Sequence, residues 1–462
     1  MDRDINDVKV PKRILSNLLA SLEAGVVPRS GAPYIAIGRG DEIASLLDNL
    51  DTVAEGGAAV RFLIGRFGSG KSFLIQLIRG YALDRDFLSA DADLSPERKL
   101  SGVGGIATYR ELMRNLACKT SPDGGALPTV LSRLFVRLKE ELINDGIFPE
   151  SAQFEPVLKQ RVYHTLSALE GGVGGFELAR VLGEYYSALS SGNEEVRSAC
   201  LRWMRGEFAT KTEARQALGF RVGGIIDDSN WYDYLKLWAT FSKILGYKGL
   251  LVYIDECINL YKIPNRISRE SNYEKLLSIF NDTLQGRANY LGVFFGGTPQ
   301  FLEDTRRGLF SYDALRSRLS DSRFSEMGYH TLSAPVIRLR RLSDNELLAL
   351  VKRLARLYQQ KVGGEALVTE EQMAVFLSHE LSRAGASEMV TPREIIRDFL
   401  TLLAILHENP QADFTSLVTK VAVSTASLNE ISARVDDESA MRNPAEQGDN
   451  SRQKIGLSDI VF

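Results

Sequence analysis

The chain has 462 residues, which is too many for one compact core, so two to three domains are expected. Its composition, with 44% hydrophobic and 25% charged residues, is that of a folded soluble protein and excludes a chain disordered throughout. The formal net charge of −3 gives no support to a protein that coats nucleic acid, although it leaves a local basic groove open.

The sequence also limits the compartment in which the protein works. No apolar run reaches membrane-spanning length, and the start, Met1-Asp2-Arg3-Asp4, lacks the apolar stretch of a secretory signal. The three cysteines, Cys118, Cys200 and Cys257, are too far apart to suggest a disulfide framework or a zinc site. We therefore expect a cytoplasmic protein without a membrane partner.

The N-terminal part contains the pattern of a nucleotide-binding α/β unit. Residues 1–30 form a lead-in with one amphipathic helix around residues 11–24, and a turn near residue 38 opens a second helix that runs through Leu50. The apolar run 59–64 predicts a strand that ends at a glycine-rich loop, and residues 72–78 predict a buried helix after it. Strand, glycine loop and helix are the context that a phosphate-binding loop requires.

The middle of the chain changes from α/β to helical spacing. A further strand is expected near residues 87–94, followed by a helix over 108–117. Over about 120–245 the apolar residues recur at helical spacing, with glycine-rich breaks between the segments. We interpret this region as a long, mainly helical insertion within the α/β domain.

The sheet resumes with unbroken apolar runs at 249–256, 291–298 and 336–339, which are typical of parallel strands covered on both faces. From Ser343 the pattern is helical, and Ser343 to Glu346 matches a capping box. The expected organisation is therefore a lead-in (1–30), a P-loop core with its insertion (31–335), a helical lid (336–424) and a polar tail, expected to be disordered, with an apolar end (425–462).

Residues 65–72 match the pattern G-x-x-x-x-G-K-[ST] of a phosphate loop. Glycines at these positions let backbone N–H groups surround phosphate oxygens, and the following helix adds its positive N-terminal end. Lys71 is expected to reach the β- and γ-phosphates of ATP, and the Ser72 hydroxyl to hold Mg²⁺. The alternative, a flexible turn that matches by chance, does not account for the flanking strand and helix. The predicted nucleotide-binding residues are Gly65, Arg66, Phe67, Gly68, Ser69, Gly70, Lys71 and Ser72.

Two acids end the apolar run at 249–256. Asp255 is placed to hold Mg²⁺ through water, and Glu256 to polarise the attacking water as a general base. Solvated acids at a strand end are the alternative, but the same chain carries a complete phosphate loop. Having both acids favours hydrolysis over storage of the nucleotide.

Four further residues are candidates with weaker support. Thr298 ends the next apolar run, where a hydroxyl would orient the lytic water, or it is an ordinary turn residue. Arg316 and Arg318 would stabilise the transferring phosphoryl group of a neighbouring subunit, or they are surface arginines. Arg393 opens a C-terminal helix from which it would reach the nucleotide.

Taken in order, these motifs resemble the AAA+ ATPases, and among them the branch that contains the origin-recognition initiators. The resemblance covers roughly residues 31–405 and begins with a Gly38-Arg39 box. It implies an α/β P-loop NTPase fold with a parallel sheet, an all-helical C-terminal lid with Arg393, and self-association in which Arg316 or Arg318 completes a neighbour's site.

The chain is more closely similar to the BREX-type ATP-binding proteins of bacterial phage-defence systems, the BrxD-like group. The segments that carry this resemblance are 34–40, 62–72, 251–256 and 391–394, together with the long helical insertion. It implies a role in discriminating or blocking invading DNA beside a helicase or other defence proteins. Whether DNA is contacted directly stays open.

Three functions therefore compete. The first is an ATP-hydrolysing AAA+ protein of phage defence that acts on DNA or on a helicase partner. The second is a signalling NTPase that recruits partners and turns over slowly. The third, a small-molecule kinase, leaves the helical lid and the arginine helix without a purpose. Stimulation of turnover by DNA separates the first from the second.

Overall fold

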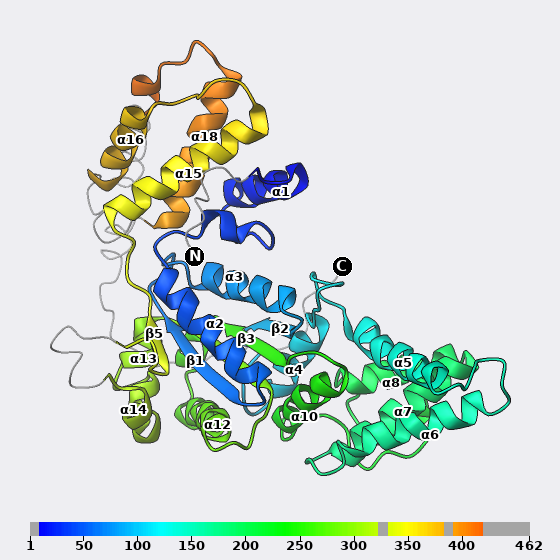
Figure 1. Ribbon diagram of the computed structural model, residues 1–462. Coiled ribbons are helices and arrows are strands. Elements are labelled where there is room, and N and C mark those ends of the chain that lie inside the picture. Colours follow the sequence, from blue (N-terminus) through cyan, green and yellow to red (C-terminus); the bar gives the residue numbers. More distant parts are fainter. Residues whose placement is uncertain (1–8, 322–330, 383–390, 419–462) are drawn as a thin grey trace, which may run out of the picture.

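A computed structural model describes residues 9–321, 331–382 and 391–418 (Figure 1). At its centre is a five-stranded sheet in the order β2-β3-β4-β1-β5, in which every neighbouring pair is parallel. The α/β class and the parallel sheet predicted from the sequence are confirmed. The strands are β1 (Ala58–Ile64), β2 (Leu88–Asp93), β3 (Leu250–Asp255), β4 (Leu291–Gly297) and β5 (Val336–Arg338).

Helices cover both faces of the sheet, which explains the unbroken apolar runs of its strands. Every residue of β3 and β4 is buried. Alternate strand residues face opposite ways: Leu63 packs with one hydrophobic cluster and Phe62 with another. One face is covered by α2 (Gly40–Ala54) and α3 (Lys71–Asp84), and the other by α4 (Gly105–Arg114), α10 (Trp231–Ile244) and α12 (Arg266–Leu284).

The register of the strands brings their carboxyl ends to one edge of the sheet. Asp93 at the end of β2 lies opposite Asp255 at the end of β3, and Ile64 at the end of β1 lies opposite Gly297. Because ligands of open parallel sheets bind beyond the carboxyl ends of the strands, this edge is the place to look for a site.

Between β2 and β3 a group of helices projects sideways from the sheet (Figure 1). Their apolar faces continue the hydrophobic cluster that lies under the sheet, so they are packed on the core and not separate from it. Buried hydrogen bonds also join them: Trp238 Nε1 donates to the Tyr109 hydroxyl, which donates to the carbonyl of Met204. These helices are α5 (Leu127–Asn144), α6 (Phe154–Ser167), α7 (Gly175–Ser191), α8 (Glu194–Met204) and α9 (Lys211–Leu218).

After β5 the chain forms a C-terminal bundle, defined here as α15 (Asp344–Val362), α16 (Glu370–Ser382) and α18 (Pro392–Glu408). The bundle has its own hydrophobic cluster, and α1 (Lys12–Glu23) contributes four buried leucines to it. The capping box predicted at Ser343 is present at the start of α15. The packing of the N-terminal helix on the bundle could not be predicted from local patterns, because this contact joins segments more than 300 residues apart.

Short elements complete the description: η2 (Ala32–Ile35), α11 (Ile258–Tyr261), α13 (Pro299–Glu303), η3 (Leu309–Ser311) and α14 (Asp313–Leu319). None of the helices within the described ranges combines the length and the apolar character needed to cross a bilayer. The tail predicted over 425–462, with its apolar end, lies outside the described residues.

Candidate functional site

The loop between β1 and α3, called the phosphate loop below (residues 65–72), depends on glycine at positions that the backbone geometry identifies. Gly68 and Gly70 have φ of +73° and +93°, which side chains rarely tolerate. A Cβ on Gly65 would lie 2.3 Å from Ser69 Oγ, so the loop closes on itself there. The Ser69 hydroxyl is buried and has no hydrogen-bond partner among the described residues.

Lys71 is the cation of this loop. Its Nζ donates hydrogen bonds to the carbonyls of Gly65 (2.9 Å) and Arg66 (3.0 Å). Burial lowers the pKa of Lys71, the carboxylates of Asp255 and Glu256 act against that effect, and the charge of Arg393 adds to it. The ammonium is thus held in the loop by weak neutral acceptors, which an anionic phosphate would outcompete.

Ser72 and Asp255 meet directly, although 183 positions separate them in the sequence. Ser72 Oγ donates to Asp255 Oδ2 over 2.6 Å, and the other carboxylate oxygen of Asp255 accepts the N–H of Glu256 over 2.8 Å. Gly296 in β4 makes room for this carboxylate, since a Cβ there would lie 2.1 Å from Asp255 Oδ1. The next residue, Glu256, is exposed and has φ of +55°.

These oxygens suit a magnesium ion that is bound together with a nucleotide. Ser72 and Asp255 supply a hydroxyl and a carboxylate, the hard oxygen donors that Mg²⁺ prefers. No group of three or more His, Cys, Asp or Glu that would hold a metal occurs in the part of the chain described here. The donor set therefore fits a metal that takes its remaining ligands from phosphate and water.

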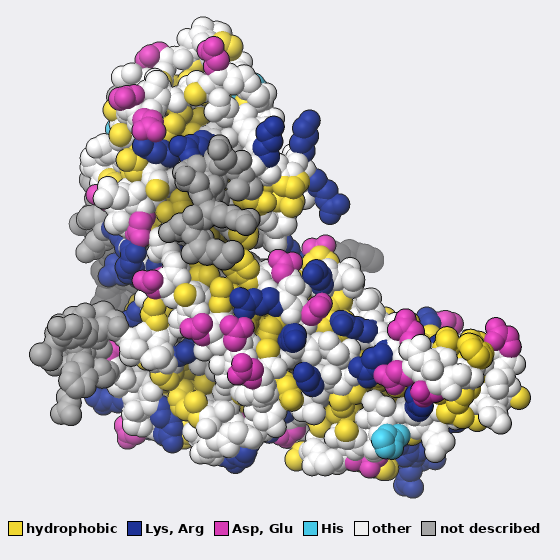
Figure 2. Space-filling model, viewed as in Figure 1, with side chains coloured by type: hydrophobic (Ala, Val, Ile, Leu, Met, Phe, Trp, Pro, Cys, Tyr) yellow, Lys and Arg dark blue, Asp and Glu magenta, His cyan; other side chains and the backbone are white. Residues whose placement is uncertain are grey.

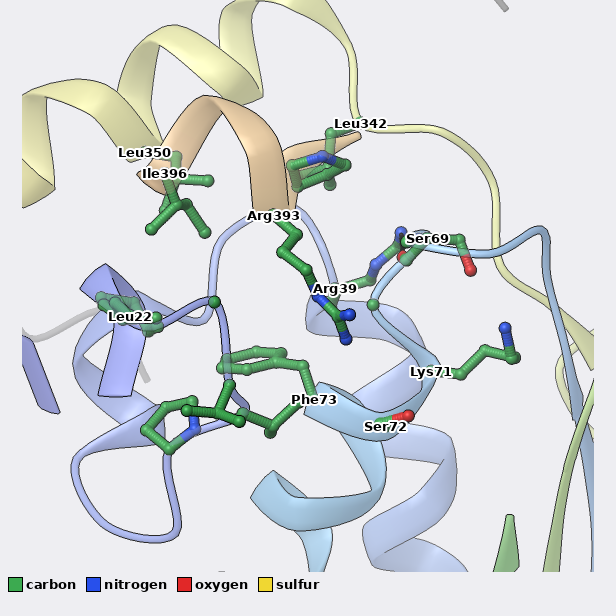
Figure 3. A pocket seen from close by; sticks show the side chains of 18 of the residues that line it. Leu22, Arg39, Ser69, Lys71, Ser72, Phe73, Leu342, Leu350, Arg393 and Ile396 are labelled. Atoms are coloured by element: carbon green, nitrogen blue, oxygen red, sulfur yellow. Dashed lines mark hydrogen bonds between the residues drawn. The ribbon is translucent and has the colours of Figure 1, made fainter. Parts of the chain in front are cut away.

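A cavity of about 210 Å³ adjoins the phosphate loop and ends between α1, α3 and the C-terminal bundle (Figure 3). In this view Arg393 points from the start of α18 into the cavity, toward the helix that begins with Lys71 and Ser72. Apart from Arg39, Glu256 and Arg393, the walls away from the loop are apolar, which suits a nucleotide base. These apolar residues are Leu22, Val26, Val27, Pro28, Ile35, Ile37, Phe73, Leu350 and Ile396.

Two residues of the site were missed by the sequence analysis. Arg39, which lines the cavity and is 5% exposed, donates to the Ser69 carbonyl over 3.0 Å. Asp93 lies beside Asp255 at the solvent-exposed end of β2, where partial desolvation of its carboxylate and the charges of Asp255 and Glu256 raise the pKa of Asp93 to about 6. The Gly38-Arg39 box was visible in the sequence, but the partner of Arg39 and the strand register of Asp93 depend on distant segments.

Three predicted residues do not join this cluster in the described chain. Thr298 caps α13, with its Oγ1 accepting the Phe301 N–H over 3.3 Å, and it does not line the cavity. Arg316 and Arg318 are exposed on α14, which packs beside α12 on the far side of the sheet from the bundle (Figure 1). Arg318 donates to the carbonyl of Ala314 one turn earlier in its own helix.

Comparisons with known proteins agree with the nucleotide-binding geometry. A family model described as BREX system ATP-binding protein BrxC/D matches residues 10–422, which is well over half of the chain. A search among curated proteins finds no match.

Proposed function

Since the chain belongs to the family of BREX system ATP-binding proteins BrxC/D, we propose that it hydrolyses ATP in phage defence. In this proposal it is an AAA+ protein whose sheet carries the nucleotide and whose C-terminal bundle serves as a lid. Arg393 supports the lid assignment, because it enters the cavity from α18.

The observation that carries the proposal is the contact between Ser72 and Asp255 at 2.6 Å, with Glu256 next in the chain. It joins the start of α3 to the end of β3, so a hydroxyl and a carboxylate of the kind that suit Mg²⁺ lie close to Lys71. When bound there, Mg²⁺ would neutralise charge on the transferring phosphoryl group. Glu256, exposed in the cavity wall, would accept a proton from the attacking water.

A positive group is still needed on the far side of the γ-phosphate, where charge develops in the transition state. Arg393 lies on the bundle side of the cavity. Arg316 and Arg318 are exposed on α14 and distant from the cavity of their own chain, a placement that suits donation to a neighbour. We therefore propose self-association in which one of these two arginines completes the site of the next subunit.

We propose that the protein uses ATP hydrolysis to act on DNA or on a DNA-processing partner such as a helicase. Figure 2 shows basic and acidic side chains interspersed over the core on one face, so that face offers no continuous basic track.

Phosphate release from ATP tests the proposal, measured with Mg²⁺ or with excess chelator, with and without double-stranded DNA, over a range of protein concentrations. We expect turnover that needs Mg²⁺ and that rises per subunit with protein concentration. Tight ATP binding without Mg²⁺-dependent turnover, also in the presence of DNA, would instead favour a nucleotide-dependent switch. Failure of the wild-type protein to bind ATP would refute the proposal as a whole.

A further inference from the structure

The side chain of Arg39, a residue of the cavity wall, donates hydrogen bonds both to the phosphate loop and to the segment that leads to the C-terminal bundle. Its Nη2 donates to the carbonyl of Ser69 (3.0 Å) in the phosphate loop and to the carbonyl of Arg340 (2.7 Å) after β5. Its Nη1 donates to Glu42 Oε1 (3.1 Å) in α2. The guanidinium thus binds three segments at once.

Burial makes these contacts strong and specific. The side chains of Arg39 and Glu42 are only 6% and 10% exposed, so the charge of each is compensated by the other and not by water. A planar guanidinium offers several N–H groups in fixed directions, which is what bridging two carbonyls and a carboxylate needs. Lysine would keep the positive charge but would lack the planar set of N–H donors that bridges these three acceptors.

The contact with Ser69 acts on the phosphate-binding N–H groups. A peptide group is planar and trans, so its carbonyl and its N–H point in opposite directions. By holding the carbonyl of Ser69, Arg39 also fixes the direction of the N–H of Gly70, the glycine just before Lys71. A phosphate that accepts a hydrogen bond from the N–H of Gly70 would therefore also change the position of the Ser69 carbonyl and its hydrogen bond with Arg39.

The contact with Arg340 acts on the segment 339–343 that joins β5 to α15. This segment and the start of α15 pass residue 38 at close range, since a Cβ on Gly38 would lie 2.9 Å from Leu342 Cδ2 and 2.6 Å from the Glu346 carboxylate. The side chain of Arg340 is paired with Glu346 and donates to the Gly38 carbonyl over 3.4 Å. Movement of Arg39 therefore displaces the start of α15, because little free space remains at the crossing.

We propose that Arg39 is a positioning residue that couples occupancy of the phosphate loop to the position of the C-terminal bundle. The inference rests on the proposed function, because it needs a nucleotide in the loop. When the phosphates bind, the peptide between Ser69 and Gly70 adjusts, and Arg39 transmits the change to the carbonyl of Arg340. The bundle, which carries Arg393, then settles against the nucleotide.

Hydrogen exchange of residues 339–347, with and without a non-hydrolysable ATP analogue and Mg²⁺, tests this coupling. The test variant is Arg39→Met with Glu42→Gln, which removes the guanidinium without leaving a buried carboxylate unpaired. The matched control is Glu42→Gln alone, which keeps the guanidinium of Arg39 and its hydrogen bonds to the carbonyls of Ser69 and Arg340. Binding of the analogue is measured separately by calorimetry, and folding by thermal melting.

We expect the analogue to slow exchange over 339–347 several-fold in the wild type and in Glu42→Gln. The double variant should bind the analogue roughly tenfold more weakly, because a charged hydrogen bond to the loop is lost. At saturating analogue it should show no slowing over 339–347. A response of the double variant equal to that of the wild type at saturation would overturn the coupling, as would loss of the response in Glu42→Gln, which keeps the guanidinium.

Two further outcomes separate this inference from the proposed function. A wild type that binds the analogue without any change over 339–347 refutes the coupling and leaves the ATPase proposal intact, whereas a wild type that does not bind refutes the ATPase proposal. If the double variant does not fold, Arg39→Lys replaces it. The response should then fall by at least about half, because an ammonium lacks the guanidinium fork, and an unchanged response would refute the coupling.

Discussion

The backbone of Glu256 has a conformation that is unfavourable for residues other than glycine. Substitutions of Glu256 can therefore test its catalytic role and its effect on folding stability separately. Its φ of +55° lies in the left-handed region, which costs a residue other than glycine about 1–2 kcal/mol. No hydrogen bond to its carboxylate from another described residue is present, and the side chain is exposed. Replacing the side chain should therefore break no protein contact.

Two substitutions at this position should have different effects. Glu256→Gln keeps the shape but cannot act as a base, so turnover should fall about 10²–10⁴-fold while ATP binding is retained. Glu256→Gly should lose turnover equally and also relieve the backbone. After allowing for the greater freedom of glycine in the unfolded chain, the gain over Glu256→Gln is about 0.5–1 kcal/mol, or about 1–2 °C in melting temperature.

The assays are phosphate release at saturating MgATP and thermal melting without nucleotide. Glu256→Gln is the control for charge, because both variants remove the carboxylate that faces Asp93 and Asp255. Turnover within twofold of the wild type in Glu256→Gln would remove Glu256 from the role of base. A Glu256→Gly protein that melts no higher than Glu256→Gln would refute the argument from backbone strain.

Three more predictions concern the same site. Lys71→Ala should abolish ATP binding, measured by calorimetry, because it removes the buried cation of the loop; unchanged affinity would contradict this. Arg316→Ala or Arg318→Ala should bind ATP but not hydrolyse it. If sites are shared between subunits, mixing the inactive arginine variant with Lys71→Ala should restore part of the ATPase activity. Absence of recovery would indicate a site that is complete within one chain. The pKa of Asp93 is raised to about 6, so the folded apo protein holds that proton more tightly than the unfolded chain and should lose stability as pH rises from about 4 to above 6. Asp93→Asn cannot titrate, so its loss of folding stability between these pH values should be smaller than that of the wild type by roughly 1 kcal/mol after allowance for solvent screening. Thermal melting at pH 5 and pH 7 measures this, and the same change in melting temperature in both proteins would contradict the prediction.

Local patterns predicted the parts of the fold that local chemistry determines. The strand before the phosphate loop was expected over 59–64 and runs over Ala58–Ile64, because an apolar run bounded by glycines leaves few alternatives. The capping box at Ser343 was also expected, since its hydrogen bonds join residues only three positions apart. The acids that end β3 could be read from the sequence for the same reason.

Contacts between distant segments could not be predicted in this way. The contact between Ser72 and Asp255 can be predicted only when the order of the strands in the sheet is known. Residue patterns did not provide that order, so the expected proximity of the two residues rested on the family resemblance. Asp93 lies in the strand expected near residues 87–94 and received no role, because its neighbour Asp255 follows more than 150 residues later in the sequence. Thr298 shows the opposite case, in which a residue at a suggestive position caps the helix that follows it.

The packing of α1 on the C-terminal bundle has a consequence for how the chain folds during synthesis. The apolar face of α1 is made first, but its partners in α15 and α18 leave the ribosome only after more than 300 further residues. At synthesis rates of about 5–20 residues per second, that delay lasts on the order of 15–80 seconds. During this time the apolar face of α1 has none of its partners in α15 and α18, which leaves it open to aggregation and to binding by chaperones.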